Sequence, residues 1–280
     1  MFQGPQVSPP LPCGPFFALS EPYEGVLDNP VKRAIIVDMP ASAVIPQEIE
    51  AKLLVARPAI LNAIARLKDL GPYRLRPQPT VRLHTIYLDT PGFTLARHGV
   101  ALRLRRNRSR WEASVKWSGQ EDGMVHSRPE LTVRLSRPPS FPFSLSSRLL
   151  AAQLSPLIAG YSLMPILISD VRRQRRGVQV SKQGKAMTFA ELALDHVRLR
   201  APGTHGQLAD TYDEIEVELK PRGTTGDLFN FAELLRTRFA LTPTAGSKFS
   251  RGLALLYGPT LFTTQPRVAR KRVRPPITQQ

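Results

Sequence analysis

The sequence predicts an α+β fold, in which a meander of antiparallel strands closes on itself or stacks and helices flank it. At least six short segments alternate charged and apolar residues with a period of two, the period of a strand with one buried face. Turn residues separate these segments, as in an antiparallel meander. Only three segments show the apolar spacing of a helix. The chain has 280 residues, of which 42% are hydrophobic, enough for one large core or two small ones.

The predicted strands are the alternating segments themselves. The longest alternation is Glu214–Lys220, where three glutamates alternate with apolar residues. The full set of predicted strands is 48–53, 84–88, 102–105, 113–117, 130–135, 192–199 and 214–220.

Three helices are predicted between the strands. Residues 58–69 begin with Pro58, a favoured first helical residue, and the Gly71-Pro72 pair is expected to end this helix. Residues 144–158 show a weaker helical pattern, and residues 227–239 carry a clear apolar stripe.

Both ends of the chain differ from the middle. Residues 1–45 are rich in proline and glycine without a sustained period, so we expect a disordered tail. The apolar piece Ala34–Val37 could still add an edge strand. Residues 264–280 carry a run of basic residues and are expected to form a second, basic disordered tail. The folded domain is therefore predicted over residues 46–263.

Charge and composition bound the partners and the compartment. The formal net charge is +17, which favours anionic partners such as nucleic acid, polyphosphate, nucleotides or an anionic membrane face. A single cysteine, Cys13, excludes an intramolecular disulfide. There is no apolar segment of the ~20 residues that span a bilayer, and the N-terminus lacks the pattern of a signal peptide. The expectation is a cytoplasmic protein.

The charges on the predicted strands are sorted by sign. Residues two apart on a strand share a face, so Glu214, Glu216 and Glu218 form one acidic row. Glu48 and Glu50 form another, and Arg103 and Arg105 form a basic row. A half-buried sheet with a solvated charged face is the simpler interpretation of any one strand. Rows of like charge nevertheless repel each other unless an ion of opposite charge lies between them.

This pattern points to metal and phosphate chemistry. Paired carboxylates suit Mg²⁺ or Mn²⁺, and arginine and lysine suit phosphate oxygens. A closed barrel would turn both sets inward. The chain has no Gly-Lys-Ser/Thr phosphate loop, no zinc-ligand spacing among its histidines and no Gly-x-Ser-x-Gly elbow.

The order of short motifs resembles the CYTH, or triphosphate tunnel metalloenzyme, superfamily. Glu48-Ile49-Glu50-Ala51-Lys52 fits its ExExK signature, which is weak alone, and Tyr87–Pro91 and Gly99–Arg105 resemble its next two elements in order. Within this superfamily the chain is most similar to the bacterial inorganic triphosphatases. The further matching segments are 111–119, 126–130, 169–173, 193–195, 214–218 and 247–252.

The resemblance implies a closed antiparallel β-barrel tunnel of about eight strands with flanking helices. It implies metal-dependent hydrolysis of inorganic triphosphate, with Mg²⁺ or Mn²⁺ as cofactor. Residues 247–251 would lie just before or on a final helix that plugs the tunnel. Glu216, Glu218 and Lys52 are the implied catalytic residues. The implied metal ligands are Glu48, Glu50, Glu130, Asp195, Glu216 and Glu218. The residues implied to hold phosphates are Lys52, Arg103, Arg105, Lys116, Arg128, Arg173, Lys248 and Arg251.

Some assignments stay open at this point. Arg172 could replace Arg173, because that segment is rich in arginine and its register is not fixed. Val197 and Arg198 stand where the family often has a glycine and an acid, which leaves the role of Asp195 open. An adenylyl cyclase or thiamine triphosphatase of the same fold is an alternative. So is a non-catalytic module for polyphosphate or nucleic acid, the nucleic acid binding only through the basic C-terminal tail.

Overall fold

The computed structural model describes residues 45–182, 184–203, 208–244 and 246–258. Both predicted tails, apart from residue 45, lie outside these residues, as does the candidate edge strand Ala34–Val37.

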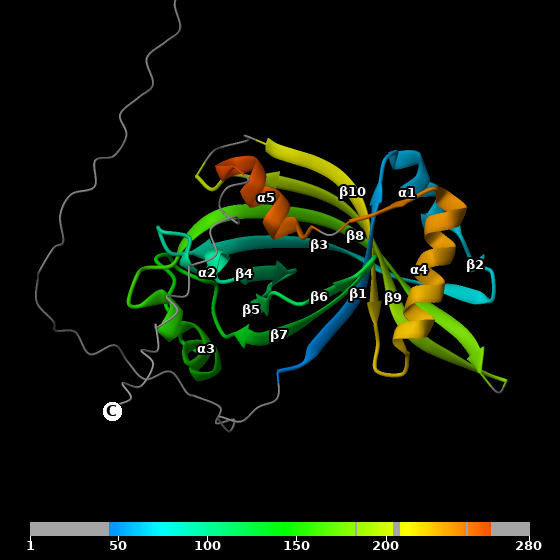
Figure 1. The fold of residues 1–280 in the computed structure, drawn as a ribbon, viewed down its shortest axis with the longest axis horizontal. Coiled ribbons are helices and arrows are strands. Elements are labelled where there is room, and N and C mark those ends of the chain that lie inside the picture. The colour runs from blue at the N-terminus through cyan, green and yellow to red at the C-terminus, as the bar shows by residue number, and fades with distance from the viewer. Residues whose placement is uncertain (1–44, 183, 204–207, 245, 259–280) are drawn as a thin grey trace, which may run out of the picture. The chain divides into compact units, whose positions relative to one another are not determined.

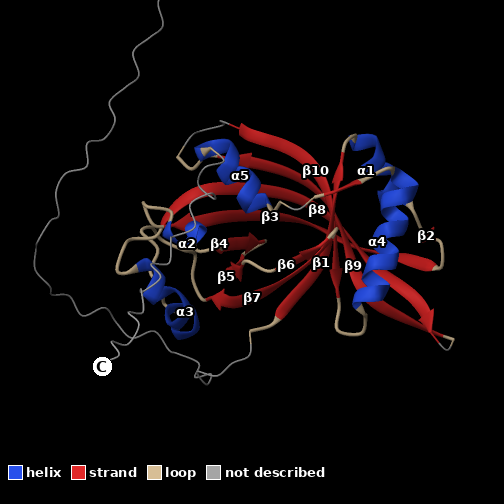
Figure 2. Cartoon of the chain, viewed as in Figure 1, coloured by secondary structure: helices blue, strands red, loops and turns tan. Residues whose placement is uncertain are grey.

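The described strands form one antiparallel sheet that closes into a ring (Figures 1 and 2). Hydrogen-bonded neighbours follow the order β1-β10-β9-β8-β3-β4-β5-β7, and β7 pairs with β1 to complete the circle. The short strands β2, β6 and β11 attach to this ring. The predicted closed antiparallel barrel is thus confirmed. The strand bounds are β1 Gln47–Val55, β2 Asp69–Leu70, β3 Tyr73–Asp89, β4 Val100–Asn107, β5 Arg110–Trp117, β6 Gln120–Asp122, β7 Val125–Leu135, β8 Met164–Lys182, β9 Lys185–Arg200, β10 Leu208–Leu219 and β11 Thr242–Pro243.

Side chains cap the N-termini of three helices, α3, α4 and α5. The Thr224 side chain accepts from the Asp227 backbone N–H, and the Asp227 carboxylate accepts from the Thr224 backbone N–H, which caps α4 reciprocally. Ser147 caps α3 through its hydroxyl. The helix bounds are α1 Pro58–Arg66, α2 Thr94–Arg97, α3 Arg148–Ile158, α4 Thr225–Phe239 and α5 Lys248–Tyr257.

The main differences from the sequence predictions are in element length. The first helix ends at Arg66 rather than residue 69, because the chain turns there into β2, which pairs with β3. Strands β3 and β9 extend well beyond the alternating segments that predicted them, and β8 extends well beyond its short basic motif. These extensions pair with each other over long registers, which local alternation alone does not reveal.

Apolar side chains on the outer face of the barrel pack against four helices, α1 and α4 in one cluster and α2 and α3 in another. Ala51 and Leu53 of β1 belong to one buried cluster with Phe231 of α4. Leu102 and Leu104 of β4 belong to another with Leu150 and Leu154 of α3. The charged neighbours of these residues on β1 and β4 therefore face the interior, as the alternation predicts.

One part of the interior is apolar, contrary to a simple charged-in, apolar-out barrel. Helix α5 contacts β8, β9 and β10 (Figure 1). Its Phe249 and Leu253 join Val171 and Val197 in a third buried cluster, and the Phe249 ring lies 5.1 Å from that of Tyr87. The predicted final helix thus exists and packs inside the ring of strands.

Among the described residues, no helix is long and apolar enough to cross a membrane.

Gly252 lies where α5 packs closely against the barrel wall. A Cβ atom at this position would overlap the side chain of Leu167 on β8. Alanine normally stabilises a helix relative to glycine by about 1 kcal/mol. We expect Gly252→Ala to do the opposite and to lower the free energy of unfolding by about 1–3 kcal/mol, the usual cost of overpacking. Urea unfolding measures this change.

The matched control is Gly226→Ala, at a helical glycine in α4 whose added Cβ would meet nothing closer than 3.8 Å. It should be neutral or stabilising. A stabilised Gly252→Ala protein would mean that α5 does not pack this tightly against β8.

Candidate active site

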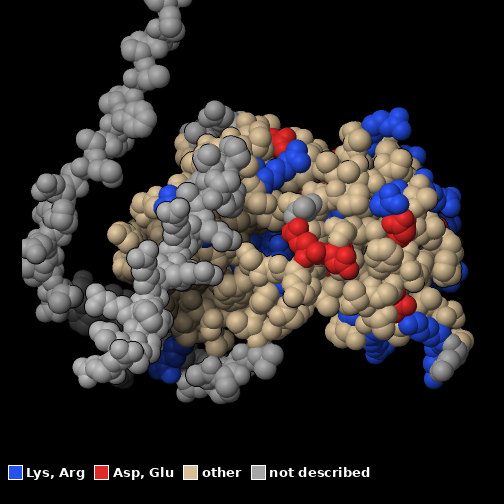
Figure 3. Space-filling view, in the orientation of Figure 1, with Lys and Arg blue, Asp and Glu red and all other residues tan. Residues whose placement is uncertain are grey.

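A charged cavity of about 200 Å³ lies inside the ring of strands. Figure 3 shows Lys and Arg side chains at the bottom of a hollow on one face. Six acidic and seven basic residues line the cavity, with few apolar ones. They are Glu48, Glu50, Glu130, Glu191, Glu216, Glu218, Lys52, Arg103, Arg105, Lys116, Arg128, Arg173 and Lys248.

The antiparallel register of β1 and β10 brings the two predicted acidic rows together. Glu50 lies directly opposite Glu218, and Lys52 lies directly opposite Glu216. Glu218 has a raised pKa, chiefly because it is buried, and the charges of Glu48 and Glu191 add to this. This end of the cavity therefore gathers carboxylates that repel one another.

Arg128 of β7 holds the first acidic pair. Its guanidinium donates to Glu50 at 2.5 Å and to Glu48 at 3.1 Å. The Lys52 ammonium lies 3.1 Å from Glu50. Burial opposes ionisation of Glu48 and Glu50, but the surrounding cations outweigh it and lower the pKa of both carboxyls. Both glutamates are therefore anionic.

On β7, two residues beyond Arg128, Glu130 joins two further cations. Arg103 donates to it at 2.8 Å, and Lys116 lies 3.1 Å from it. Burial opposes ionisation of Glu130, yet Arg103 and Lys116 bring its pKa to about 2. Burial, assisted by the charge of Arg103, lowers the pKa of Lys116 to about 8.

Two arginines on β4 retain capacity to bind an anion. Burial, together with repulsion from Arg103 and Arg173, lowers the pKa of Arg105 to about 10. An anion bound beside Arg105 would therefore be favourable. Among the residues that the structure describes, the only side-chain hydrogen-bond partner of Arg105 is the hydroxyl of Thr85, at 3.1 Å. The Nε of Arg103 is buried without a hydrogen-bond acceptor. An unsatisfied buried donor costs free energy that an anionic ligand could recover.

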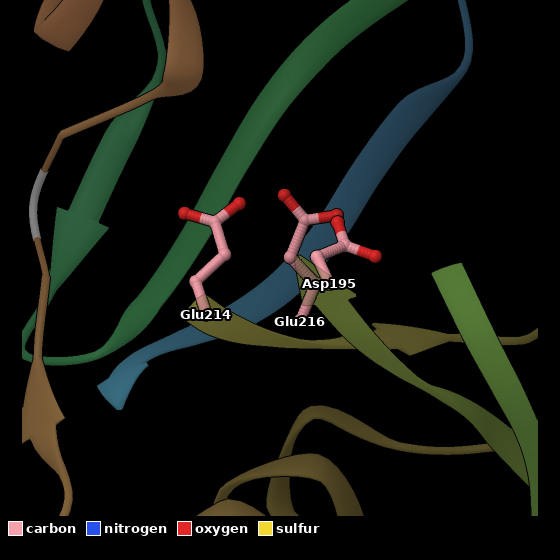
Figure 4. Close-up of side chains that lie close together, drawn as sticks. All are labelled: Asp195, Glu214 and Glu216. Carbon is pink, nitrogen blue, oxygen red and sulfur yellow. The ribbon is translucent and has the colours of Figure 1, made fainter. Parts of the chain in front are cut away.

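A lysine from α5 occupies a cluster of three carboxylates. Oxygen atoms of Asp195, Glu214 and Glu216 lie within 4.8 Å of one another (Figure 4). The Lys248 ammonium lies 3.0 Å from Asp195 and 2.9 Å from Glu216, and it also contacts Glu214. Burial alone would lower the pKa of Lys248, but these carboxylates raise it well above its usual value. Lys248 thus acts as a tethered cation that joins α5 to β9 and β10.

The structure distinguishes Arg172 from Arg173. Arg173 faces inward, donates to both oxygens of Asp195 at 2.8 and 2.7 Å and also contacts Glu216. Arg172 projects outward and is exposed. Asp195 is fully buried in these contacts, despite the departures at Val197 and Arg198. The register that the sequence left open therefore favours Arg173.

Arg251 lies away from the cavity lining, unlike the other predicted phosphate ligands. Its guanidinium donates to Asp210 at 2.6 Å and lies over the Tyr212 ring at 4.1 Å. Asp195 also lies behind the lining rather than on it. Their assigned roles remain predictions.

Two acidic residues at the site have no role in the sequence analysis. Glu214 belongs to the acidic row with Glu216 but is not assigned as a ligand there, and in the structure it contacts Lys248. Glu191 lines the cavity from β9 and shares the inward face of that strand with Asp195. The period-two rule could have found Glu191.

Comparison with known proteins gives a family match. The family model described as CYTH domain matches residues 46–253. The inorganic triphosphatase of Haemophilus influenzae is 28% identical over 209 residues, which are 75% of this chain and 55% of that protein. The chain thus spans about half the length of the curated relative that it matches.

A solved structure shows the same fold. The Hippeastrum protein HpAC1, an adenylyl cyclase candidate described as having a dominant triphosphatase activity, superposes with a TM-score of 0.50 at 18% identity. The match covers 74% of this chain and 95% of HpAC1.

The tethered lysine gives a stability prediction. Lys248→Met removes a cation from three buried carboxylates, and such uncompensated charge typically costs about 3–5 kcal/mol. Urea unfolding of the chelator-treated protein should show a loss of this size. Lys182→Met, which breaks an exposed pair with Asp227, should change the free energy of unfolding by no more than about 1 kcal/mol. Equal, small losses in both variants would contradict the tether.

Proposed function

The chain belongs to the CYTH domain family, and on that premise we propose that it hydrolyses inorganic triphosphate inside the barrel with the help of Mg²⁺ or Mn²⁺. The observation that carries the proposal is the cavity itself. Acidic and basic side chains line it in nearly equal number. Among the charged lining residues, β10 contributes only glutamates and β4 only arginines, whereas β1 and β7 contribute both signs. A polyphosphate chain with a bound cation complements such a lining.

The residues present fit a divalent metal ion. Glu48, Glu50, Glu216 and Glu218 offer only oxygen donors, which Mg²⁺ and Mn²⁺ prefer. Burial is the main cause of the raised pKa of Glu218, and the charges of Glu48 and Glu191 add to it. A cation bound beside these carboxylates would relieve their repulsion. A bound metal would neutralise phosphate oxygens and activate a water molecule. Asp195, behind the lining, and Glu130, on it, are each engaged by cations of the protein, so we propose that they hold these cations in place.

The basic wall is proposed to hold the phosphates. Arg103, Arg105 and Lys116 are buried cations on neighbouring strands β4 and β5. Arginine binds phosphate oxygens through two parallel hydrogen bonds, and such contacts strengthen in a confined, desolvated space. Arg103 brings an unsatisfied donor, and Arg105 has only a hydroxyl partner. Four other lysine and arginine side chains now pair with carboxylates of the protein and would exchange these for phosphate oxygens when the substrate binds. They are Lys52, Arg128, Arg173 and Lys248.

The chemistry asked of the protein is mostly positioning. Phosphoryl transfer needs charge neutralisation and an oriented nucleophile rather than a covalent intermediate. We propose that Glu216 or Glu218 orients the attacking water, with Lys52 stabilising charge on the transferred group. Glu218 is suited to act as a general base, because its pKa is raised and a carboxylate with a higher pKa accepts a proton from water more readily.

Phosphate release from triphosphate, ATP and thiamine triphosphate tests the proposal directly. We expect inorganic triphosphate to be hydrolysed with the highest kcat/KM, in keeping with the name of the Haemophilus relative. Preferred use of ATP with pyrophosphate release would favour the adenylyl cyclase alternative. Binding of polyphosphate without turnover of any of the three would favour a non-catalytic module. A cytoplasmic location is part of the proposal.

Removal of metal should abolish turnover. The acidic rows repel an anionic substrate unless a cation lies between them. We expect hydrolysis of triphosphate to fall to background in excess EDTA and to return with Mg²⁺ or Mn²⁺. The melting temperature, followed in parallel, should show that the protein stays folded. Undiminished turnover after chelation would refute the metal requirement.

Two arginines that are adjacent in sequence lie on opposite faces of β4 and allow a matched comparison. Arg105 lines the cavity, whereas Arg106 projects outward over the Trp111 ring. We expect Arg105→Ala to lower kcat/KM for triphosphate at least about tenfold, on the order of 1.4 kcal/mol. Arg106→Ala removes the same charge one residue away and should leave kcat/KM nearly unchanged. Equal effects of the two variants would mean that general electrostatics, rather than a contact in the cavity, explains the loss.

A further inference from the structure

The cavity accounts for almost none of the positive charge of the protein. Six acids and seven bases line it, whereas the chain carries a formal net charge of +17. Residues 264–280 contribute five of the basic side chains. Most of the excess therefore belongs to other surfaces, and the proposed reaction inside the barrel does not explain it.

A stretch of the outer barrel face is left bare by the helices. On β3, Arg82 and His84 share the outward face with Ile86, which packs in the cluster under α3. On β9, His196 and Arg198 share the outward face with Leu194, which packs in the cluster under α4. Between these two packed ends the outward side chains of β3, β8 and β9 are mostly charged.

Four exposed arginines dominate this bare stretch, which we call the arginine face. Arg82 and Arg172 are directly opposed across β3 and β8, and Arg172 in turn faces His196 on β9. In the adjacent row, Arg106, His84, Asp170 and Arg198 follow one another across β4, β3, β8 and β9. Like charges directly opposite on a sheet destabilise it. The arginine face consists of Arg82, Arg106, Arg172 and Arg198.

The carboxylates on this face are already engaged by other residues. Asp170 accepts from His84 at 2.7 Å and from Arg200 at 3.0 and 2.8 Å. Asp213 lies 2.7 Å from the ring of His196. Within the part of the chain that the structure describes, the four arginines have no ion pair. The like-charge repulsion on this face therefore remains for an external anion to relieve.

We propose that the arginine face binds the phosphate backbone of a single-stranded nucleic acid. Guanidinium groups bind backbone phosphates through paired hydrogen bonds, and cationic positions repeat here about every 5 Å across neighbouring strands. An extended polyanion laid across β4, β3, β8 and β9 meets a cation on each side of the neutralised Asp170. This binding site is separate from the cavity and does not depend on the proposed hydrolysis.

An aromatic residue beside the arginines favours a nucleic acid over inorganic polyphosphate. Trp111 is half-buried at the edge of the face. The guanidinium carbon of Arg106 lies 5.8 Å from the centroid of its ring, and the ring centroids of His84 and Trp111 lie 6.3 Å apart in an edge-to-face arrangement. Unpaired bases stack on such aromatic and guanidinium surfaces, and this contributes about 1–3 kcal/mol per base. Polyphosphate has no group that could stack on the Trp111 ring, and the bases of a duplex are not free to stack on it.

Fluorescence anisotropy of a labelled single-stranded 20-mer tests the proposal. The full chain is titrated in EDTA at several salt concentrations, against the triple variant Arg82→Gln/Arg172→Gln/Arg198→Gln. We expect this variant to bind at least tenfold more weakly. The slope of log affinity against log salt should fall in magnitude by about 2, as expected for three lost phosphate contacts on a single strand. Hydrolysis of triphosphate should be unchanged, since none of the three residues lines the cavity.

Matched variants decide between this surface and general electrostatics. Arg57→Gln/Arg66→Gln/Arg222→Gln removes the same charge from exposed positions elsewhere and should retain most of the affinity. An equal loss in this control would overturn the proposal. So would loss of binding only when the five basic residues of 264–280 are replaced by glutamine, tighter binding of a duplex of the same sequence, or full displacement by inorganic polyphosphate at matched charge. Displacement by triphosphate would place the oligonucleotide in the cavity and would also refute it.

Discussion

The structure depends on burying many charges of both signs inside a closed sheet. An isolated charge in such a space costs several kcal/mol, so each cavity carboxylate must have a cation close by. Arg128 serves Glu48 and Glu50, and Lys248 serves the cluster on β9 and β10. Pairing of β1 with β7 brings Arg128 within reach of its two glutamates, and packing of α5 on β8, β9 and β10 brings Lys248 to its carboxylates. Packing of the outer clusters stabilises the sheet that holds them.

Helix α5 links the charged and apolar parts of the interior. Phe249 and Leu253 place it in an apolar cluster within the barrel, while Lys248, at the first helical position, extends to the carboxylates. Ser247 and Ser250 cap this end of the helix reciprocally, which fixes the start of the helix at Lys248. Helix α5 therefore fills part of the barrel interior and supplies the Lys248 cation beside the cavity. The cavity is the part of the interior that α5 leaves open.

The inward and outward faces of the same strands present charges in different environments. Arg105 and Arg106 are neighbours in sequence, yet one lines a confined cavity and the other lies exposed beside Trp111. Inside, acids and bases nearly balance, so selectivity comes from their arrangement. Outside, the arginines outnumber the free carboxylates, so attraction is long-range and depends on salt. The high net charge of the chain belongs to this second environment.

The sequence by itself determined parts of seven of the eight ring strands, because the period-two alternation of residues such as Glu48 to Leu53 persists in any sheet that buries one face. The rows of like charge selected part of the cavity lining, namely Glu48, Glu50, Arg103, Arg105, Glu216 and Glu218. The order of motifs supplied the other assigned lining residues and the family. Only the tertiary structure decided that Arg173, not Arg172, faces Asp195, that Arg251 points elsewhere, and that Lys248 lies among three carboxylates. Register, bulges and the position of α5 depend on contacts between residues distant in sequence, and local patterns carry no record of these.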